Sequence, residues 1–408
     1  MIWKNRRFQV FVAGLLLVVG VGVGVFAWLE QDEEAEPTNI TIDGEDVDTE
    51  LAVETVTDDI SAPWGLEFLP EDGKLLVTEN QGELLLVDVD NDSQEAISGI
   101  PEVDDSGQGG LLDVTIGPDF QDEPWVYLTY SAANEQGLTS TYVGRGQLDI
   151  PDRRLDSFEE LYVAEPFRDS TSHYGSRVVI DDDGYLFVSI GDRGDKNFDD
   201  HPSQDTSNVL GATIRLRADG SIPEDNPFTH DPSVVDEIYS YGHRNVQGMA
   251  IHPETGELWQ SEHGEEDGDE INIIEAGGNY GWPLAHTGCE YGTDTPVGDW
   301  PQERDDTINP VFYWECGSGG FPPAGMAFYD RMALSEWQNG LFVGGLASEY
   351  LAHFTVEDRE LTEQEPLLAD RGWRIRDVTV GGHDGALYVA AEGDMEAIVR
   401  IAPQTISE

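Results

Sequence analysis

The sequence predicts an all-β fold, a six-bladed β-propeller preceded by one N-terminal transmembrane helix. Three observations lead to this prediction. An apolar run of helical length lies near the N-terminus, a strand-like unit then recurs six times, and no long amphipathic helix interrupts these repeats.

The apolar run covers residues 8–29 and follows three basic side chains within residues 1–7. As a helix it would span about 33 Å, against about 30 Å for the hydrocarbon core of a bilayer. Because the next basic residue is Lys74, the positive-inside rule places residues 1–7 in the cytoplasm and the rest outside. We therefore expect a single-pass protein of the cell membrane with its main domain extracellular. A cleaved signal peptide, which would make the protein secreted, is the alternative, although its apolar region is usually about 7–15 residues long.

Residues 30–52 are acidic and poor in apolar side chains, so we expect a flexible linker before a domain at 53–403. The whole chain has a net charge of -61, from 82 acidic and 21 basic residues. Such a surface repels nucleic acid, which is excluded as a partner. An acidic chain with so little lysine is typical of a halophilic protein, since the screening length falls to about 3 Å in 1 M salt.

The repeated unit is a polar turn followed by a strand of alternating apolar residues. Its spacing of about 45–85 residues indicates propeller blades with long loops, where functional residues are expected. An array of β-sandwiches is the alternative, but sandwiches do not require this recurrence. The six copies are EDGKLLVTE (71–79), DEPWVYLTYS (122–131), DDGYLFVSIGD (182–192), ETGELWQSEHG (254–264), WQNGLFVGGL (337–346) and HDGALYVAAEG (383–393).

Both cysteines of the chain, Cys289 and Cys316, stand in glycine-rich segments. An extracellular location permits a disulfide, which would stabilise the fold by about 3 kcal/mol. Two unpaired thiols are the alternative.

Three of the loops between repeats carry polar side chains that a turn does not need. Gln108, in GQGGLLD, can both donate and accept hydrogen bonds. The glycines on either side of it allow a ligand to approach the backbone closely. His173, in SHYGSR, precedes a strand and could act as a general base. Arg244 and Asn245, in YGHRNVQG, place a planar donor fork beside an amide, which suits a carboxylate or a quinone. Taken singly, the first two are equally well explained by local hydrogen bonding.

Arg374 and Arg376 alternate along WRIRD and therefore point to one face of a strand. In a chain so poor in basic residues, this pair suggests an anionic ligand, with a salt-bridged surface pair as the alternative. The segment 261–283 instead concentrates carboxylates, which favours either a hard cation such as Ca²⁺ or simple solvation.

Taken in order, these motifs resemble the soluble quinoprotein glucose dehydrogenase and aldose sugar dehydrogenase family. The resemblance runs from about residue 60 to residue 403 and rests on an ordered set of segments rather than on one motif. The segments are PWGLEFLP, GQGGLLDVTIGPDF, HYGSRVVIDDDGYLFVSIGD, GSIPEDNPF, YGHRNVQGMAIHP, SEHGEEDGDEIN, GGNYGWP, GMAFYD and RIRDV.

The resemblance implies oxidation of an aldose sugar at C1 to the lactone, with pyrroloquinoline quinone (PQQ) and Ca²⁺ as cofactors and an electron acceptor that the sequence does not identify. It implies that His173 is the base and that Arg244 stabilises charge on the quinone. The implied quinone-binding residues are Gln108, Arg244, Asn245, Arg374 and Arg376, and the implied calcium ligands are Gly264 and Glu265 through the backbone, with Glu270 and Tyr280.

The sequence departs from the family pattern at three positions. Ala347 stands where a quinone-contacting lysine is common, Glu265 where proline is usual, and Ser172 where Asp or Asn often precedes the base. The lost lysine should weaken quinone binding by about 1–3 kcal/mol. Two other functions remain open at this point: a non-catalytic propeller that binds carbohydrate or a partner, which Ala347 favours, and a calcium-dependent lactonase, which the retained arginines disfavour.

Overall fold

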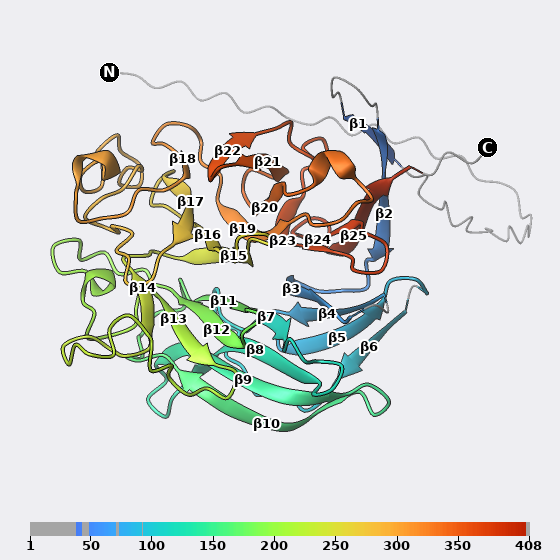
Figure 1. Ribbon diagram of the computed structural model, residues 1–408, viewed down its shortest axis with the longest axis horizontal. Helices are drawn as coiled ribbons and strands as arrows, with labels where there is room; N and C mark the ends of the chain where they lie inside the picture. Colours follow the sequence, from blue (N-terminus) through green and yellow to red (C-terminus); the bar gives the residue numbers. More distant parts are fainter. Residues whose placement is uncertain (1–37, 43–48, 71–72, 92, 405–408) are drawn as a thin grey trace, which may run out of the picture. The chain divides into compact units, whose positions relative to one another are not determined.

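The computed structural model describes residues 38–42, 49–70, 73–91 and 93–404. In this part of the chain, strands form six antiparallel sheets arranged around a common centre, five of four strands and one of five (Figure 1). The predicted six-bladed β-propeller is confirmed. The predicted transmembrane helix at 8–29 lies outside the described residues, and among those described no helix is long and apolar enough to cross a membrane.

The first three blades follow the chain in order, and each strand pairs with its sequence neighbour. Short polar turns connect most of these strands, so local sequence is sufficient to set the pairing. The strands are β3 (Pro63–Phe68), β4 (Lys74–Glu79), β5 (Glu83–Asp88), β6 (Ser93–Ile97), β7 (Leu111–Ile116), β8 (Trp125–Ala133), β9 (Thr139–Asp149), β10 (Arg154–Val163), β11 (Gly175–Ile180), β12 (Tyr185–Ile190), β13 (Ala212–Arg217) and β14 (Ile238–Tyr241).

The next two blades repeat this pattern, with short 3₁₀ turns at Pro301–Glu303 and Ser335–Trp337 in their connecting loops; a similar turn at Pro202–Gln204 lies between β12 and β13 of the third blade. Cys289, in the long connection between β17 and β18, forms a disulfide with Cys316, which follows β18, so the predicted disulfide is confirmed. The strands are β15 (Val246–Ile251), β16 (Leu258–Glu262), β17 (Asp269–Ile274), β18 (Phe312–Trp314), β19 (Pro323–Phe328), β20 (Leu341–Gly345), β21 (Leu351–Glu357) and β22 (Glu360–Glu363).

The last blade joins the two ends of the domain. Strands β23 (Arg374–Val380), β24 (Leu387–Glu392) and β25 (Ala397–Pro403) come from the C-terminal part, and β2 (Thr49–Thr57) adds to β25 from the N-terminal part, followed by β1 (Thr38–Ile42). The linker expected over 30–52 therefore contains strand β1 and the start of β2. Nothing in the local sequence reveals this pairing, because the partner strand is more than 340 residues away.

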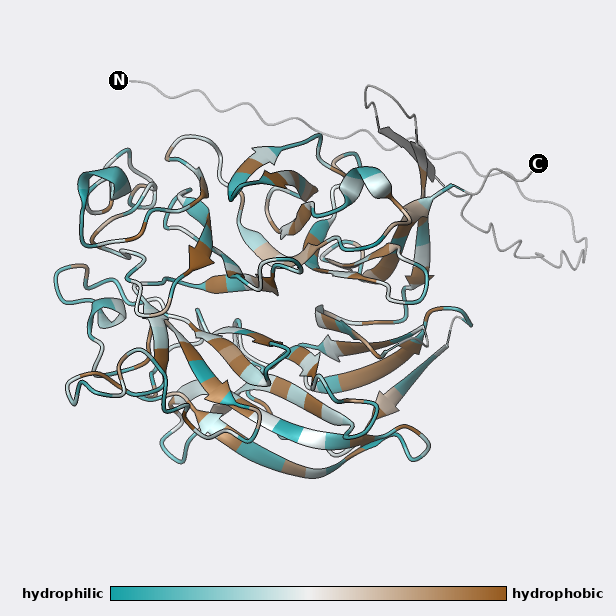
Figure 2. Cartoon of the chain, in the orientation of Figure 1, coloured by the Kyte–Doolittle hydropathy of each residue, from teal (hydrophilic) through white to brown (hydrophobic). Residues whose placement is uncertain are grey.

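All six sequence repeats are the second strand of a blade, namely β4, β8, β12, β16, β20 and β24. The first strands, β3, β7, β11, β15, β19 and β23, contact one another in a closed ring around the axis. Apolar and polar residues alternate along the strands (Figure 2), and the apolar ones pack between neighbouring blades. This packing holds the inner strands at fixed positions, so side chains from all six blades can meet at the axis.

Candidate active site

A cavity of about 420 Å³ lies where the inner strands begin. This size is within the usual range of ligand pockets, roughly 300–1,000 Å³. The structure brings together four of the residues singled out in the sequence, Gln108, Asn245, Arg374 and Arg376, and adds Ala347 to the same lining. Residues from separate loops and blades therefore converge on one polar cavity.

His173 stands beside this cavity, in the loop that leads into β11. Its φ of 50° is a left-handed conformation that costs energy for a residue other than glycine. Two contacts hold it there: its backbone N–H donates to Gln108 Oε1 at 2.7 Å, and its carbonyl lies against Gly191, where an added Cβ would collide with the oxygen. The imidazole is 13% exposed, so the ring is fixed in position but remains accessible.

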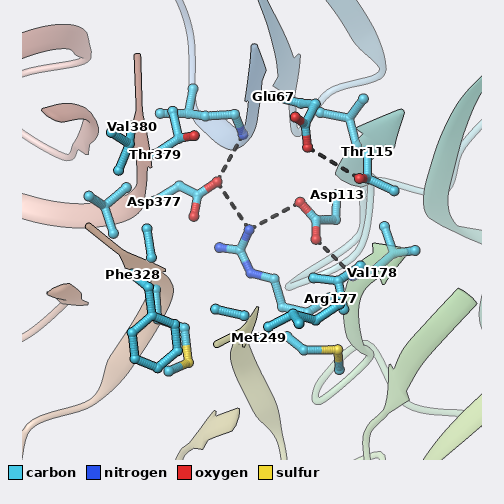
Figure 3. Close-up of a pocket in the computed structure, with 18 of the residues that line it drawn as sticks. Glu67, Asp113, Thr115, Arg177, Val178, Met249, Phe328, Asp377, Thr379 and Val380 are labelled. Atoms are coloured by element: carbon cyan, nitrogen blue, oxygen red, sulfur yellow. Dashed lines mark hydrogen bonds and ion pairs between the residues drawn. The ribbon is translucent and has the colours of Figure 1, made fainter. Parts of the chain in front are cut away.

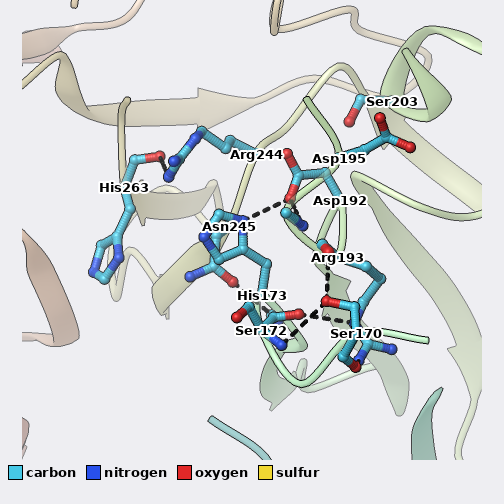
Figure 4. Close-up of polar contacts among 12 residues, drawn as sticks. Ser170, Ser172, His173, Asp192, Arg193, Asp195, Ser203, Arg244, Asn245 and His263 are labelled. Carbon is cyan, nitrogen blue, oxygen red and sulfur yellow. Dashed lines mark hydrogen bonds and ion pairs between the residues drawn. The ribbon is translucent and has the colours of Figure 1, made fainter. Parts of the chain in front are cut away.

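Asp192 is the group that orients the imidazole (Figure 4). It is 1% exposed and its Oδ1 lies 2.6 Å from His173 Nδ1 and 2.7 Å from the backbone nitrogen of Gly194. Its Oδ2 accepts a hydrogen bond from Trp282 Nε1 at 3.0 Å. Burial opposes the charge, but the hydrogen bond and charge of His173, followed by the charges of Arg244 and His201, lower the pKa of Asp192 below its usual value. An ionised Asp192 makes Nδ1 the protonated nitrogen, which leaves Nε2 as the basic one.

A second histidine, His263, lines the same cavity but has a different role. Its Nε2 is 2.7 Å from the carbonyl oxygen of Pro323 and donates to it. Burial, and then the charges of Arg244 and His173, lower the pKa of His263 to about 3, so the ring is neutral. Because no carboxylate contacts His263 in the described part of the chain, it lacks the orienting partner that His173 has.

Arg244 is 3% exposed, and its carbonyl oxygen accepts a hydrogen bond from the backbone N–H of Asp192 at 2.8 Å. Its Nη2 donates to Glu265 Oε2 at 2.8 Å and its Nη1 to the carbonyl of His263 at 3.3 Å, while the guanidinium lies 5.2 Å from the Trp282 ring. Lys196 also donates to the Glu265 carboxylate, so two cations share this one anion. The Nε of Arg244 is buried and has no hydrogen-bond partner among the residues that the structure describes. A buried donor of this kind is available to a bound acceptor.

Arg374 and Arg376 both bind Glu392, which follows them on strand β24. Arg374 Nε lies 2.9 Å from Oε1 and Arg376 Nε lies 2.8 Å from Oε2. Burial opposes the charge on Glu392, but the charge and hydrogen bond of Arg376, with those of Arg374, lower its pKa below the usual value. Two cations therefore face one anion, and this part of the cavity keeps an excess of positive charge.

The acidic segment does not gather into one cluster. The N–H of Gly264 donates to Asp269 Oδ1 at 2.9 Å, and Glu265 is held by the two cations described above. Glu270 is buried opposite Glu262 in the ladder, and burial, with the charge of Glu262, raises the pKa of Glu270 well above its usual value. The hydroxyl of Tyr280 donates to the carbonyl of Ile273 and accepts from the N–H of Glu275, both at 2.7 Å. Both hydrogen bonds are made within the blade itself.

Within the described ranges, no group of three or more His, Cys, Asp or Glu side chains is arranged to hold a metal ion. The carbonyl oxygens of Gly264 and Glu265 are nevertheless the kind of ligand that Ca²⁺ accepts. Four of the five predicted quinone-binding residues, Gln108, Asn245, Arg374 and Arg376, line one cavity, whereas Arg244 is not part of its lining. Glu270 and Tyr280 lie within the packing of the fourth blade.

Sequence reasoning missed Asp192, although a signal for it exists. Because β11 and β12 pair with Gly175 opposite Ile190, extending the ladder by two residues brings His173 to Asp192. Asp192 is therefore the carboxylate partner of His173, a role that Ser172, the residue before the base, does not fill. Glu392 carries no such signal, because its role depends on the packing of two neighbouring strands.

Known proteins resemble this chain in both sequence and fold. Residues 60–400 match the family model described as Glucose / Sorbosone dehydrogenase. The chain is 38% identical to aldose sugar dehydrogenase YliI of Escherichia coli (strain K12) over 353 residues, which are 86% of this chain and 93% of that protein.

Two solved structures are similar over most of this chain. The apo-form crystal structure of the soluble aldose sugar dehydrogenase from Escherichia coli has a TM-score of 0.81 and 38% identity, and the match covers 87% of this chain and 100% of that one. The PQQ-bound aldose sugar dehydrogenase from Streptomyces coelicolor has a TM-score of 0.69 and 26% identity, with 87% and 98% covered.

Proposed function

Since this chain belongs to the glucose/sorbosone dehydrogenase family and is an oxidoreductase acting on sugar CH–OH groups, we propose that it oxidises an aldose at C1 to the lactone, using PQQ and Ca²⁺. One observation carries the proposal. The His173–Asp192 pair stands at the edge of a cavity that also gathers Arg374, Arg376 and Asn245.

The cavity fits a planar polyanionic quinone. Arg374 and Arg376 supply positive charge in excess of Glu392, Asn245 and Gln108 supply amide groups, and the buried Nε of Arg244 lacks a partner among the described residues. Planar guanidinium groups match carboxylates in shape and hydrogen bonding. The quinone, when bound, supplies the oxidising power, because it takes up the hydride that leaves C1 of the sugar.

Calcium is the second part of the proposal. We assign its ligands to the carbonyl oxygens of Gly264 and Glu265, because the Glu265 carboxylate is neutralised by Lys196 and Arg244. Beside the cation, Arg244 would hold the negative charge that develops during reduction.

His173 acts on the sugar itself. Its Nε2 removes the proton of the anomeric hydroxyl as hydride leaves C1, and the C1–O bond becomes the carbonyl of the lactone. Asp192 holds the ring through Nδ1 and stabilises the imidazolium that forms. The proton then returns to solvent from an imidazole that is partly exposed.

The experiment is a dye-linked assay with purified protein, glucose as the aldose, and PQQ and CaCl₂ added separately and together. Dye reduction should occur only when both are present, and replacing CaCl₂ with a chelator should abolish it. Turnover without quinone, or none under any of these conditions, would show that the proposal is wrong.

We also propose that residues 8–29 anchor the protein in the cell membrane with the propeller outside. The charge pattern around this segment supports the proposal. Membrane fractionation should recover the full chain with the lipid, and release of a shorter chain into the medium would instead indicate a cleaved signal.

A further inference from the structure

A single arginine, Arg177 of β11, occupies the propeller axis (Figure 3). It is 4% exposed, and its Nη1 lies 3.1 Å from both Asp113 Oδ1 and Asp377 Oδ2. Its Nε donates to the carbonyl of Gln247 at 2.5 Å, and its Nη2 to the carbonyl of Arg376 at 3.1 Å. One side chain of β11 thus contacts the inner strands of three other blades, β7, β15 and β23.

The two remaining blades meet the same cluster. Asp377 Oδ2 accepts a hydrogen bond from the N–H of Leu66 on β3 at 2.8 Å. On β19, a Cβ at Gly325 would collide with Asp377 Oδ1 and lie 2.9 Å from Arg177 Nη2, so only glycine leaves room for the cluster. All six inner strands therefore converge on the Asp113–Arg177–Asp377 group.

This group separates two cavities on the axis. On one side lies the candidate active site; on the other lies a cavity of about 270 Å³ lined by Arg177, both aspartates and Glu67. Burial, against the opposing charge of Arg177, raises the pKa of Asp113 to about 6, as expected for carboxylates confined in this position.

Three residues of the active-site lining, Gln247, Arg376 and Trp64, contact the Arg177 guanidinium. Gln247 and Arg376 line the active-site cavity, and their carbonyl oxygens accept hydrogen bonds from Arg177. The ring of Trp64, also in the lining, lies 4.2 Å from the guanidinium carbon. A planar five-donor group can hold two carbonyls, two carboxylates and an aromatic face at once, whereas an ammonium group cannot.

We propose that Arg177 is a positioning residue for the dehydrogenase: it holds the floor of the quinone cavity by fixing Trp64, Gln247 and Arg376. This inference rests on the proposed function. Arg177 is separated from the cavity by the residues that it holds, so it acts through them and not on the substrate. Small displacements of such a floor are costly, because about 1 Å of misplacement can reduce activity by about 100-fold.

Arg145 offers a matched control on β9. It stacks on Trp125 at 4.1 Å, pairs with Glu159, and donates to the carbonyl of Ala218 at 2.8 Å, but none of these residues lines the active-site cavity. Arg177→Lys and Arg145→Lys remove the same kind of contacts, one at the axis and one at the periphery.

The test measures PQQ affinity by titration in CaCl₂, together with the melting temperature and the kcat and KM for glucose. Arg177→Lys should weaken PQQ binding by about tenfold or more, whereas Arg145→Lys should change it less than about twofold. Equal affinities in the two variants, at similar losses of melting temperature, would overturn the inference. If Arg177→Lys does not fold, Asp377→Asn keeps the shape of the cluster and must show the same contrast with Arg145→Lys.

Hydrogen exchange separates this inference from the proposed function. If the wild-type protein binds no PQQ, the proposed function fails. Even in that case, if Arg177 holds the cavity floor, deuterium uptake in β23 should be higher in Arg177→Lys than in wild type. Uptake in Arg145→Lys should equal that of wild type. Unchanged uptake in both variants would refute the positioning role.

Discussion

Replacing Asp192 with asparagine tests the catalytic pair most sharply, because the change removes one charge and almost no volume. The carboxylate accepts from three donors: His173 Nδ1 at 2.6 Å, the N–H of Gly194 at 2.7 Å and Trp282 Nε1 at 3.0 Å. An amide has one oxygen and one NH₂ group, so it can accept either from His173 and Gly194 or from Trp282, but not from all three.

Each orientation of the new amide in Asp192→Asn would have its own cost. With the amide oxygen toward His173, the imidazole keeps its tautomer, but the NH₂ group faces Trp282 and the imidazolium loses its anionic partner. With the NH₂ group toward His173, the proton moves to Nε2 and the base is lost. Loss of a general base reduces turnover by about 10²-fold to 10⁴-fold, and the wrong tautomer in a comparable His–Asp pair reduces it by about 10⁴-fold. We therefore expect a loss of kcat of about 10²-fold to 10⁴-fold, which corresponds to about 3–5 kcal/mol.

The assay is dye-linked turnover at saturating PQQ and CaCl₂, with PQQ affinity measured separately. Asp384→Asn is the matched control, because Asp384 also accepts three hydrogen bonds, from Ala386, Tyr388 and Arg400, in a blade region that does not line the cavity. Asp192→Asn should lose turnover and keep PQQ affinity, and Asp384→Asn should keep both. Near-normal turnover of Asp192→Asn would refute the assigned role.

Three further predictions concern the cofactor, pH and salt. Ala347→Lys should tighten PQQ binding by about tenfold, since it restores a charged contact in the cavity lining; a titration showing equal or weaker affinity would contradict this. Burial raises the pKa of Glu67 to about 8, so its protonated form stabilises the fold at low pH and that contribution is lost as the pH rises through about 8. Glu67→Gln should therefore gain stability relative to wild type as the pH rises from about 4.5 to about 8, on the order of 2–4 kcal/mol, and identical pH profiles in urea unfolding would count against it. The net charge of -61 predicts a higher melting temperature in molar than in millimolar salt, and thermal unfolding that does not depend on salt would rule this out.

The blades could be predicted because their signal is local. Each repeat combines its own turn with its own alternation of apolar residues, and all six became the second strand of a blade. The closing strand β2 could not be found in this way. Its acidic, weakly patterned sequence forms a strand because β25 offers an unpaired edge.

The residues of the candidate site also fall into those that the local sequence could predict and those that it could not. Gln108 and Asn245 could be chosen because their side chains have more polar capacity than a turn requires. Arg374 and Arg376 could be chosen because they share one face of a strand in a chain poor in basic residues, and the structure gathers all four in one cavity. Arg177 could not be predicted as a functional residue, because one arginine in an apolar strand gives no indication that two aspartates from other blades will contact it.

The central claim, that His173 removes the proton while an aldose reduces the bound quinone, is tested most directly by one single-turnover measurement. Wild type and His173→Ala, both loaded with PQQ and Ca²⁺, are mixed with glucose, and the quinone absorption is followed. The variant should bind PQQ as tightly as wild type and reduce it about 10²-fold to 10⁴-fold more slowly. Reduction at the wild-type rate would remove His173 from the mechanism, and loss of PQQ binding would make it a binding residue instead.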